Sequence, residues 1–128
     1  MNQPLYVEFD VERRTVRVVY QTQPSFDQWR ATIEAALEDP RFQPGFGILL
    51  DRSRILKPAS PEYMRLLVDF VDQHATEMEA RWAIVLSDLA SFEMGRKAGM
   101  SASKARIGAF KDRNAAELWL CGGDRRVS

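Results

Sequence analysis

Alternating or continuously apolar stretches predict five strands in this chain. Residues 5–9 and 15–20 alternate between apolar and polar positions, which is typical of strands with one buried face, and the polar stretch DVERR between them predicts a hairpin. Residues 47–50 (GILL) and 81–88 (RWAIVLSD) are apolar at most positions, the pattern of strands buried on both faces. We interpret ARIGAF at 105–110 as a third strand of this buried kind.

Apolar residues at helical spacing predict helices between these strands. Ser25 and Ser60 are predicted N-caps, and Pro61 takes the first helical position, where its missing N–H costs no bond. A weaker helix is predicted to end near residue 101, and a short helix follows Asp112. The first two helices each carry one apolar stripe: Phe26, Trp29, Ile33, Ala36 and Leu37 in the first, and Met64, Leu67, Val68, Val71, Ala75 and Met78 in the second, with Phe70 outside its margin.

The order of these elements, ββαβαβαβα, predicts the fold class. Its connections are short enough for right-handed crossovers between parallel strands. We therefore predict a single α/β domain with a mixed, mostly parallel sheet of about five strands covered by helices. The chain has 128 residues and is 45% hydrophobic, enough to bury a core without metals or disulfides. The domain is expected to span residues 1–121, and residues 122–128 to form a flexible C-terminal tail.

Composition argues against several classes of partner and location. Lys plus Arg and Asp plus Glu are 18 each, so no global field attracts nucleic acid. No apolar run approaches the roughly 20 residues of a transmembrane segment, and the N-terminus lacks the regions of a signal peptide. The single cysteine, Cys121, can form no internal disulfide. We therefore expect a cytoplasmic protein that binds no nucleic acid.

The carboxyl ends of the parallel strands are the expected place for a working site. Six polar residues fall along this edge: Asp51, Ser53, Ser87, Asp88, Lys111 and Asp112. One interpretation is a metal-dependent phosphoacceptor site at Asp51. The other, which we take first, is that Asp88 and Asp112 cap the helices that they precede. His74 is the only histidine, which argues against paired-histidine metal sites and hydrolase triads, and it is expected to be partly buried with one hydrogen bond.

Two segments are candidates for binding. In the 52–60 loop, several basic residues could favour a phosphate on Ser60 at the helix start, although Glu62 would repel it and an N-cap role is the first interpretation. In the 89–100 segment, Arg96 interrupts the apolar stripe that a helix would present. Gly95 and Gly99 each weaken a helix by about 1 kcal/mol relative to alanine. This segment is either an adaptable contact surface or lid, or a poorly formed helix held by tertiary contacts.

Charge is segregated along the chain although it is balanced overall. Residues 62–93 hold seven acidic and two basic residues, whereas residues 96–113 hold six basic and one acidic residue. Patches of opposite sign can steer a protein partner or support self-association, and a solvated face is the alternative explanation.

The succession GILLDRS, SPEY at a helix start, RWAIVLSD, SFEMGR and FKDRNAAELWL resembles the SpoIIAA-like family, whose fold is that of STAS domains. The resemblance covers about residues 5–120. It implies a STAS-like sheet covered by helices and no catalytic centre, in a family with many small bacterial proteins of unassigned function.

The same resemblance implies two roles. Better-studied STAS domains antagonise anti-sigma factors and are switched by phosphorylation of a serine at the helix start after the third strand. Ser60 has the comparable place, although Lys57-Pro58-Ala59-Ser60-Pro61 departs from their Asp-Ser-Ser-Gly type sequence. SpoIIAA-like proteins are also similar to the lipid-binding CRAL-TRIO fold, which implies an apolar ligand under the 89–100 segment.

These observations together predict a non-enzymatic binding or regulatory domain with no catalytic residue, metal or cofactor. Its partner is expected to be a protein or another copy of the chain in a homodimer. The expected interaction surface comprises Arg52, Ser53, Arg54, Lys57, Ser60, Phe92, Met94 and Arg96. One alternative is a carrier of a small apolar or lipid-like ligand lined by Phe92, Met94 and Met100. A second is an anti-sigma-factor-antagonist-type switch phosphorylated at Ser60.

Overall fold

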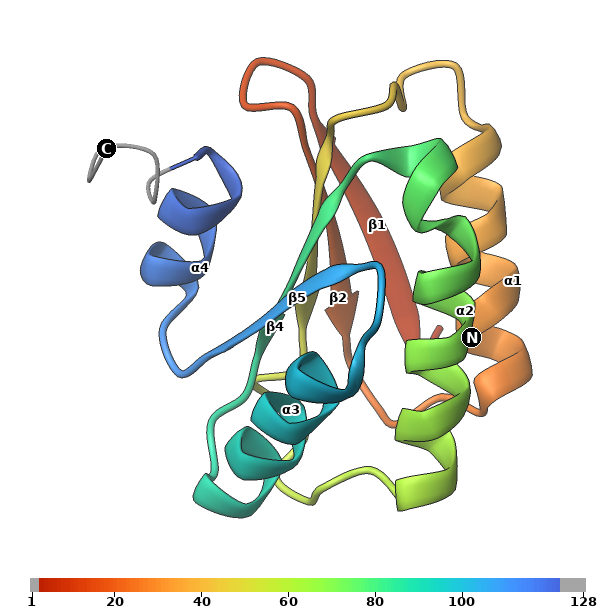
Figure 1. Ribbon diagram of the computed structural model, residues 1–128. Coiled ribbons are helices and arrows are strands. Elements are labelled where there is room, and N and C mark those ends of the chain that lie inside the picture. The colour runs from red at the N-terminus through yellow and green to blue at the C-terminus, as the bar shows by residue number, and fades with distance from the viewer. Residues whose placement is uncertain (1–2, 123–128) are drawn as a thin grey trace.

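The computed structural model describes residues 3–122 and confirms the predicted α/β architecture, a five-stranded mixed sheet with four helices in this part of the chain (Figure 1). The elements are β1 (Leu5–Asp10), β2 (Thr15–Tyr20), α1 (Phe26–Glu38), β3 (Gly47–Asp51), α2 (Pro61–Met78), β4 (Arg81–Val85), α3 (Leu89–Ser101), β5 (Arg106–Phe110) and α4 (Arg113–Leu120). Of the predicted tail, Gly122 is buried in a turn, and residues 123–128 lie outside the described residues.

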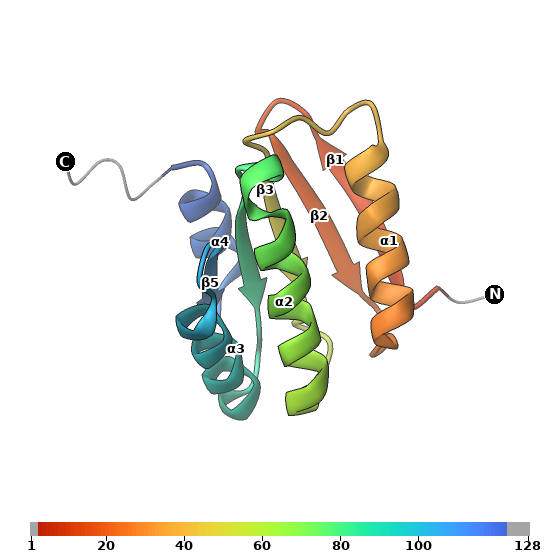
Figure 2. The ribbon, with the colours of Figure 1, turned by 45° about the vertical axis from the view of Figure 1, so that its right-hand side comes forward.

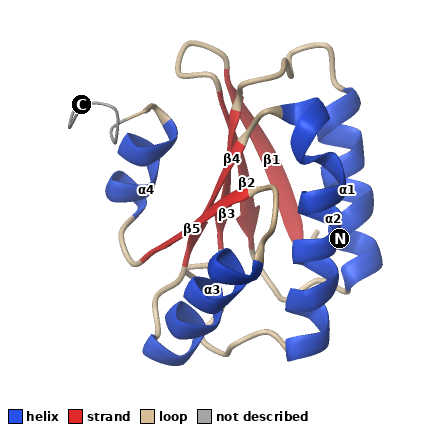
Figure 3. Cartoon of the chain, in the orientation of Figure 1, coloured by secondary structure: helices blue, strands red, loops and turns tan. Residues whose placement is uncertain are grey.

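The strands lie in the order β1-β2-β3-β4-β5. The β1–β2 hairpin is antiparallel, and β2, β3, β4 and β5 are mutually parallel. Because each crossover advances by one strand in the same direction, right-handedness puts α1, α2 and α3 on one face of the sheet. Figure 2 shows these three helices side by side, and Figure 3 shows α4 on the opposite side of the sheet.

Alternation along the strands builds a core on each face. One face packs against α1, α2 and α3, and the other packs against α4 through Leu49, Ala83, Val85 and Ala116. The central strands β3 and β4 are therefore buried on both faces, as their apolar runs predicted. The same prediction for residues 105–110 is wrong, because β5 is the sheet edge and is only partly buried.

The start of α1 agrees with the sequence prediction, whereas the burial of one residue of α2 does not. Ser25 forms a capping box with Gln28, so α1 begins where its N-cap was predicted. Phe70, predicted to lie outside the apolar face of α2, is buried. It packs edge-on against Trp29, with ring centroids 5.3 Å apart, and stacks on His74 at 4.3 Å. Contact between α1 and α2 thus widens the buried face of α2 beyond its own stripe.

Candidate functional site

The four parallel strands end at one edge of the sheet, as predicted for the three that follow the hairpin. Val19, Asp51, Val85 and Phe110 are paired in register across β2, β3, β4 and β5. The loop after β3 and the start of α3 both lie at this edge, which is the lower edge in Figure 1. We call it the strand-end edge, and it brings the predicted polar residues of successive strands into one region.

Asp51 is engaged in holding the loop that follows it. Its carboxylate accepts hydrogen bonds from the Ser53 backbone N–H at 3.0 Å and the Ser53 hydroxyl at 2.6 Å, and it lies 3.5 Å from Arg113 Nη1. The Ser87 hydroxyl then donates to the Ser53 carbonyl at 2.8 Å, which ties this loop to the end of β4. Within residues 3–122, no three acidic, histidine or cysteine side chains are grouped to hold a metal ion. The phosphoacceptor interpretation of Asp51 therefore lacks the acidic cluster that it requires.

The other carboxylates of the edge are helix caps, which confirms the first interpretation. Asp88 accepts from the Ser91 backbone N–H at 3.0 Å, and Asp112 accepts from the Ala115 backbone N–H at 3.3 Å. The Lys111 ammonium lies 4.8 Å from the centre of the Phe92 ring. His74 is half-buried, as expected, and its Nδ1 lies 3.0 Å from the Phe70 carbonyl oxygen.

Ser60 is an exposed N-cap, and its hydroxyl accepts from the Tyr63 backbone N–H at 3.1 Å. We expect Ser60→Ala to lower the free energy of unfolding by about 1 kcal/mol, because a donor at the start of α2 loses its partner. Ser60→Asp should restore the cap and stay within about 0.5 kcal/mol of the wild type. Urea unfolding monitored by circular dichroism measures both. A Ser60→Ala variant as stable as the wild type would argue that the cap contributes nothing.

Arg52 requires a correction, because it is 2% exposed and does not belong to the interaction surface. Alternation continues past the end of β3, so Arg52 points to the side of α1 and α2, opposite to Asp51. Its Nη2 donates to Gln23 Oε1 at 2.7 Å, and its guanidinium lies 4.9 Å from the Tyr20 ring centre and 5.9 Å from that of Tyr63. The indole of Trp29 completes this group, which we call the Arg52 cluster: Tyr20, Gln23, Trp29, Arg52 and Tyr63.

The Arg52 cluster contains four buried polar atoms without a hydrogen-bond partner. These are Arg52 Nη1, Tyr20 Oη, Tyr63 Oη and Trp29 Nε1. Burial raises the pKa of the Tyr20 hydroxyl and of the Tyr63 hydroxyl, so both remain protonated at neutral pH and can donate. Periodicity in the sequence places Trp29 on the apolar stripe of its helix and Tyr20 at the end of the strand at 15–20, and it indicates no polar role for either. One signal in the sequence could have indicated the burial of Arg52. Arg52 follows the inward-facing Leu50 by two residues, so continued strand alternation directs its side chain to the same face of the sheet.

A pocket of about 680 Å³ lies beside the Arg52 cluster. Its walls are residues 54–60, Pro24 and two members of the cluster, Gln23 and Tyr63. Arg54, Lys57 and Ser60 of the predicted surface are exposed along this wall, and Ser53 is half-buried. The 52–60 loop is therefore both a connection and one side of an open recess.

The 89–100 segment forms most of α3, a regular helix, and does not gather its predicted ligand-lining residues in one pocket. Phe92 packs partly buried against the core. Met94 lines a groove of about 670 Å³ between α2 and α3, whereas Met100 is 73% exposed and lies outside that groove. Arg96 is exposed and pairs with Glu93 at 2.9 Å. The groove at Met94 therefore does not bring Phe92 and Met100 to the same lining.

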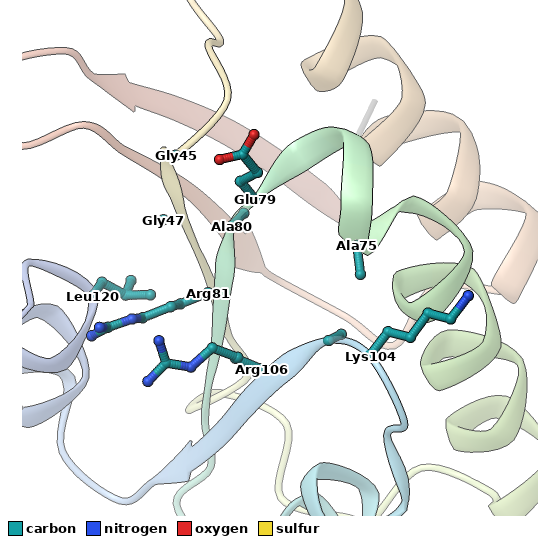
Figure 4. A pocket seen from close by; sticks show the side chains of 10 residues that line it. Gly45, Gly47, Ala75, Glu79, Ala80, Arg81, Lys104, Arg106 and Leu120 are labelled. Carbon is teal, nitrogen blue, oxygen red and sulfur yellow. The ribbon is translucent and has the colours of Figure 1, made fainter.

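A smaller pocket of about 350 Å³ lies at the opposite edge, where β3, β4 and β5 begin. It is lined by three basic residues, Arg81, Lys104 and Arg106. Figure 4 shows that Arg81 and Arg106 extend toward Leu120, whereas Lys104 points the other way. Arg81 Nη1 donates to the Trp119 carbonyl at 2.6 Å, which attaches α4 to the sheet. The cationic groups do not converge on one point, so this pocket is a weaker candidate than the one beside Arg52.

Two further observations bear on identity. None of the helices between residues 3 and 122 combines the length and apolar character required to cross a membrane. Comparison of the chain with protein-family models, with curated proteins and with solved structures finds no significant match.

Proposed function

We propose that this chain is a non-enzymatic, STAS-like binding domain of the cytoplasm that recognises a protein partner, or a second copy of itself, through its strand-end edge. The observation that carries the proposal is a pair of leucines at this edge. Leu56 in the loop after β3 is 71% exposed, and Leu89 at the start of α3 is 67% exposed. Each is a large apolar side chain exposed at the same edge, and apolar side chains form the centre of most protein contact surfaces.

Hydrogen bonds hold the two leucine-bearing segments in a fixed relation. The Arg52 backbone N–H donates to the Val85 carbonyl at 2.9 Å, and the Ser87 hydroxyl donates to the Ser53 carbonyl at 2.8 Å. These bonds join the beginning of the 52–60 loop to the end of β4. A partner therefore meets a preorganised surface, which reduces the entropy lost on binding.

The charges beside Leu56 favour one kind of partner surface. Arg54 and Lys57 are exposed on either side of the leucine. A complementary surface would combine an apolar side chain with acidic residues, because opposite potentials increase the association rate and the specificity. The acidic, exposed part of α2, with Glu62 and Asp69, could provide such a surface in a second copy.

The double change Leu56→Asp and Leu89→Asp tests this surface. We expect it to weaken the interaction at least tenfold, since two apolar contacts are lost and acidic groups are introduced. Self-association is measured by sedimentation velocity, and other partners by quantitative capture from the native host.

The matched control is Leu118→Asp, a 58% exposed leucine on α4, which should leave the interaction unchanged. If the double variant keeps the oligomeric state and captures the same proteins in the same amounts as this control, the proposed surface is wrong.

A further inference from the structure

The guanidinium of Arg52 is a buried cation whose nearest counter-charge is not hydrogen-bonded to it: the pKa of the Asp88 carboxyl is lowered mainly by Ser91 and to a smaller extent by the charge of Arg52. Among the described residues, no carboxylate forms an ion pair with it, and its only side-chain hydrogen bond goes to the neutral amide of Gln23. Contacts with the faces of Tyr20 and Tyr63 compensate part of the lost hydration. A buried charge without a hydrogen-bonded counter-charge is costly, so the Arg52 guanidinium is better suited to an anion than to its present neutral hydrogen-bond partner, Gln23.

The rest of the cluster is rich in hydrogen-bond donors and contains no charged acceptor. Arg52 Nη1 and Trp29 Nε1 can only donate, and the two tyrosine hydroxyls can donate. The Tyr20 hydroxyl lies among Tyr63, Arg52 and Trp29, each of which affects its pKa. Two tyrosine hydroxyls and one indole N–H around a buried cation form a preorganised environment for an incoming oxygen acceptor.

Gln23 lies between Arg52 and the pocket, since it lines the pocket and its side chain accepts a hydrogen bond from Arg52. Gln23 is exposed as a residue. Its Oε1 accepts from Arg52, and its Nε2 donates to the Pro24 carbonyl at 3.0 Å. Arg52 does not itself line the pocket, so a ligand there reaches the guanidinium only if the Gln23 side chain rotates away. The remaining wall of the pocket is largely apolar, with Ile55, Leu56 and Ala59. Its volume of about 680 Å³ is typical of sites for small molecules.

We propose that this pocket binds a small molecule with one carboxylate on an apolar body, and that the carboxylate replaces Gln23 Oε1 as the partner of Arg52. The apolar body then lies against the 54–60 segment, and the exposed Arg54 and Lys57 attract the anion during association. The site is separate from the groove at Met94, and the inference does not depend on a protein partner at Leu56 and Leu89.

Calorimetric titration of the full chain tests the proposal. The acids are octanoate and 3-phenylpropionate, and each is compared with the alcohol that has the same apolar body, 1-octanol and 3-phenyl-1-propanol. We expect at least one acid to bind at least tenfold more tightly than its alcohol at pH 7. Arg52→Met should remove this preference without lowering the melting temperature, because it replaces an uncompensated buried cation by an apolar side chain of similar length. Equal binding of acids and alcohols, or no binding of either acid, would overturn the proposal and leave the cluster as a water site.

Gln23→Glu provides an internal carboxylate at the position that already accepts from Arg52. We expect it to raise the melting temperature and to weaken binding of the acids at least tenfold, because it occupies the anion position. Gln21→Glu adds the same charge at another exposed glutamine and should change neither quantity. If both variants behave alike, Arg52 does not select an anion through this position, and the proposal is overturned.

Discussion

Gly99→Ala is expected to lower the free energy of unfolding by about 2 kcal/mol, although alanine is the better helix former by about 1 kcal/mol. A Cβ atom at Gly99 would lie 2.5 Å from the Ile107 carbonyl oxygen of β5, closer than side-chain carbons approach oxygen. Because the neighbour is backbone of the sheet edge, relief requires α3 or β5 to move. Urea unfolding of the purified variant measures the effect.

Gly95→Ala is the matched control for this change. It lies one turn earlier on the same helix and gains the same helix propensity. Its added Cβ would meet Leu86 Cδ1 at 2.8 Å, the far end of a flexible side chain that can rotate away. We expect the free energy of unfolding to change by no more than about 1 kcal/mol in either direction. If Gly99→Ala were at least as stable as this control, α3 would not approach β5 so closely.

The two glycines illustrate which part of α3 the sequence could predict. Local patterns correctly predicted a helix in this region, but they assigned Gly95 and Gly99 only a cost in helix propensity. Their spacing places both on one face of the helix, where the absence of side chains allows close packing on β5. That neighbour comes from another element, so periodicity within the segment could not identify it.

The position of the strand-end edge could be predicted from the sequence, whereas the burial of individual residues along it could not. Parallel strands necessarily bring their carboxyl ends together, so Asp51, Ser53, Ser87 and the two capping aspartates were correctly placed at one edge. The burial of Arg52 depends on the rings of Tyr20 and Tyr63, which arrive from β2 and α2. A charged residue in a loop is usually exposed, and only the three-dimensional neighbours reverse that expectation.

A partly buried ion cluster, with Arg17 as its buried member, attaches α4 to the face of the sheet opposite α1, α2 and α3. Arg17 on β2 is only 9% exposed, and its guanidinium donates to Glu117 of α4 at 2.7 and 3.2 Å and to Asp10 of β1 at 2.9 Å. Arg113 adds a bond to Glu117 at 3.1 Å. Hydrogen bonding by Arg17 lowers the pKa of the Glu117 carboxyl, and hydrogen bonding by Glu117 raises the pKa of the Arg17 guanidinium.

Glu117→Gln is therefore expected to lower the free energy of unfolding by about 2 kcal/mol at pH 7, because Arg17 loses its main counter-charge in a largely buried position. The folded-state pKa of Glu117 lies below its ordinary value of 4.5, so its contribution is complete above that value and is lost as the pH falls through the folded-state pKa. Arg17 stays protonated throughout this range and adds no pH dependence of its own.

As the pH falls from 7 to about 3, the difference in stability between the wild type and Glu117→Gln should consequently stay constant down to the ordinary pKa of 4.5 and shrink below it, since the wild-type carboxyl is then increasingly protonated and resembles the amide. Urea unfolding at several pH values in this interval measures the convergence. Glu62→Gln is the control, because the Glu62–Arg65 pair is exposed on α2 and should contribute less than about 0.5 kcal/mol at any pH. A Glu117→Gln effect that stays constant across the interval would mean that ionisation of Glu117 does not stabilise the attachment of α4, and that only its shape and packing matter.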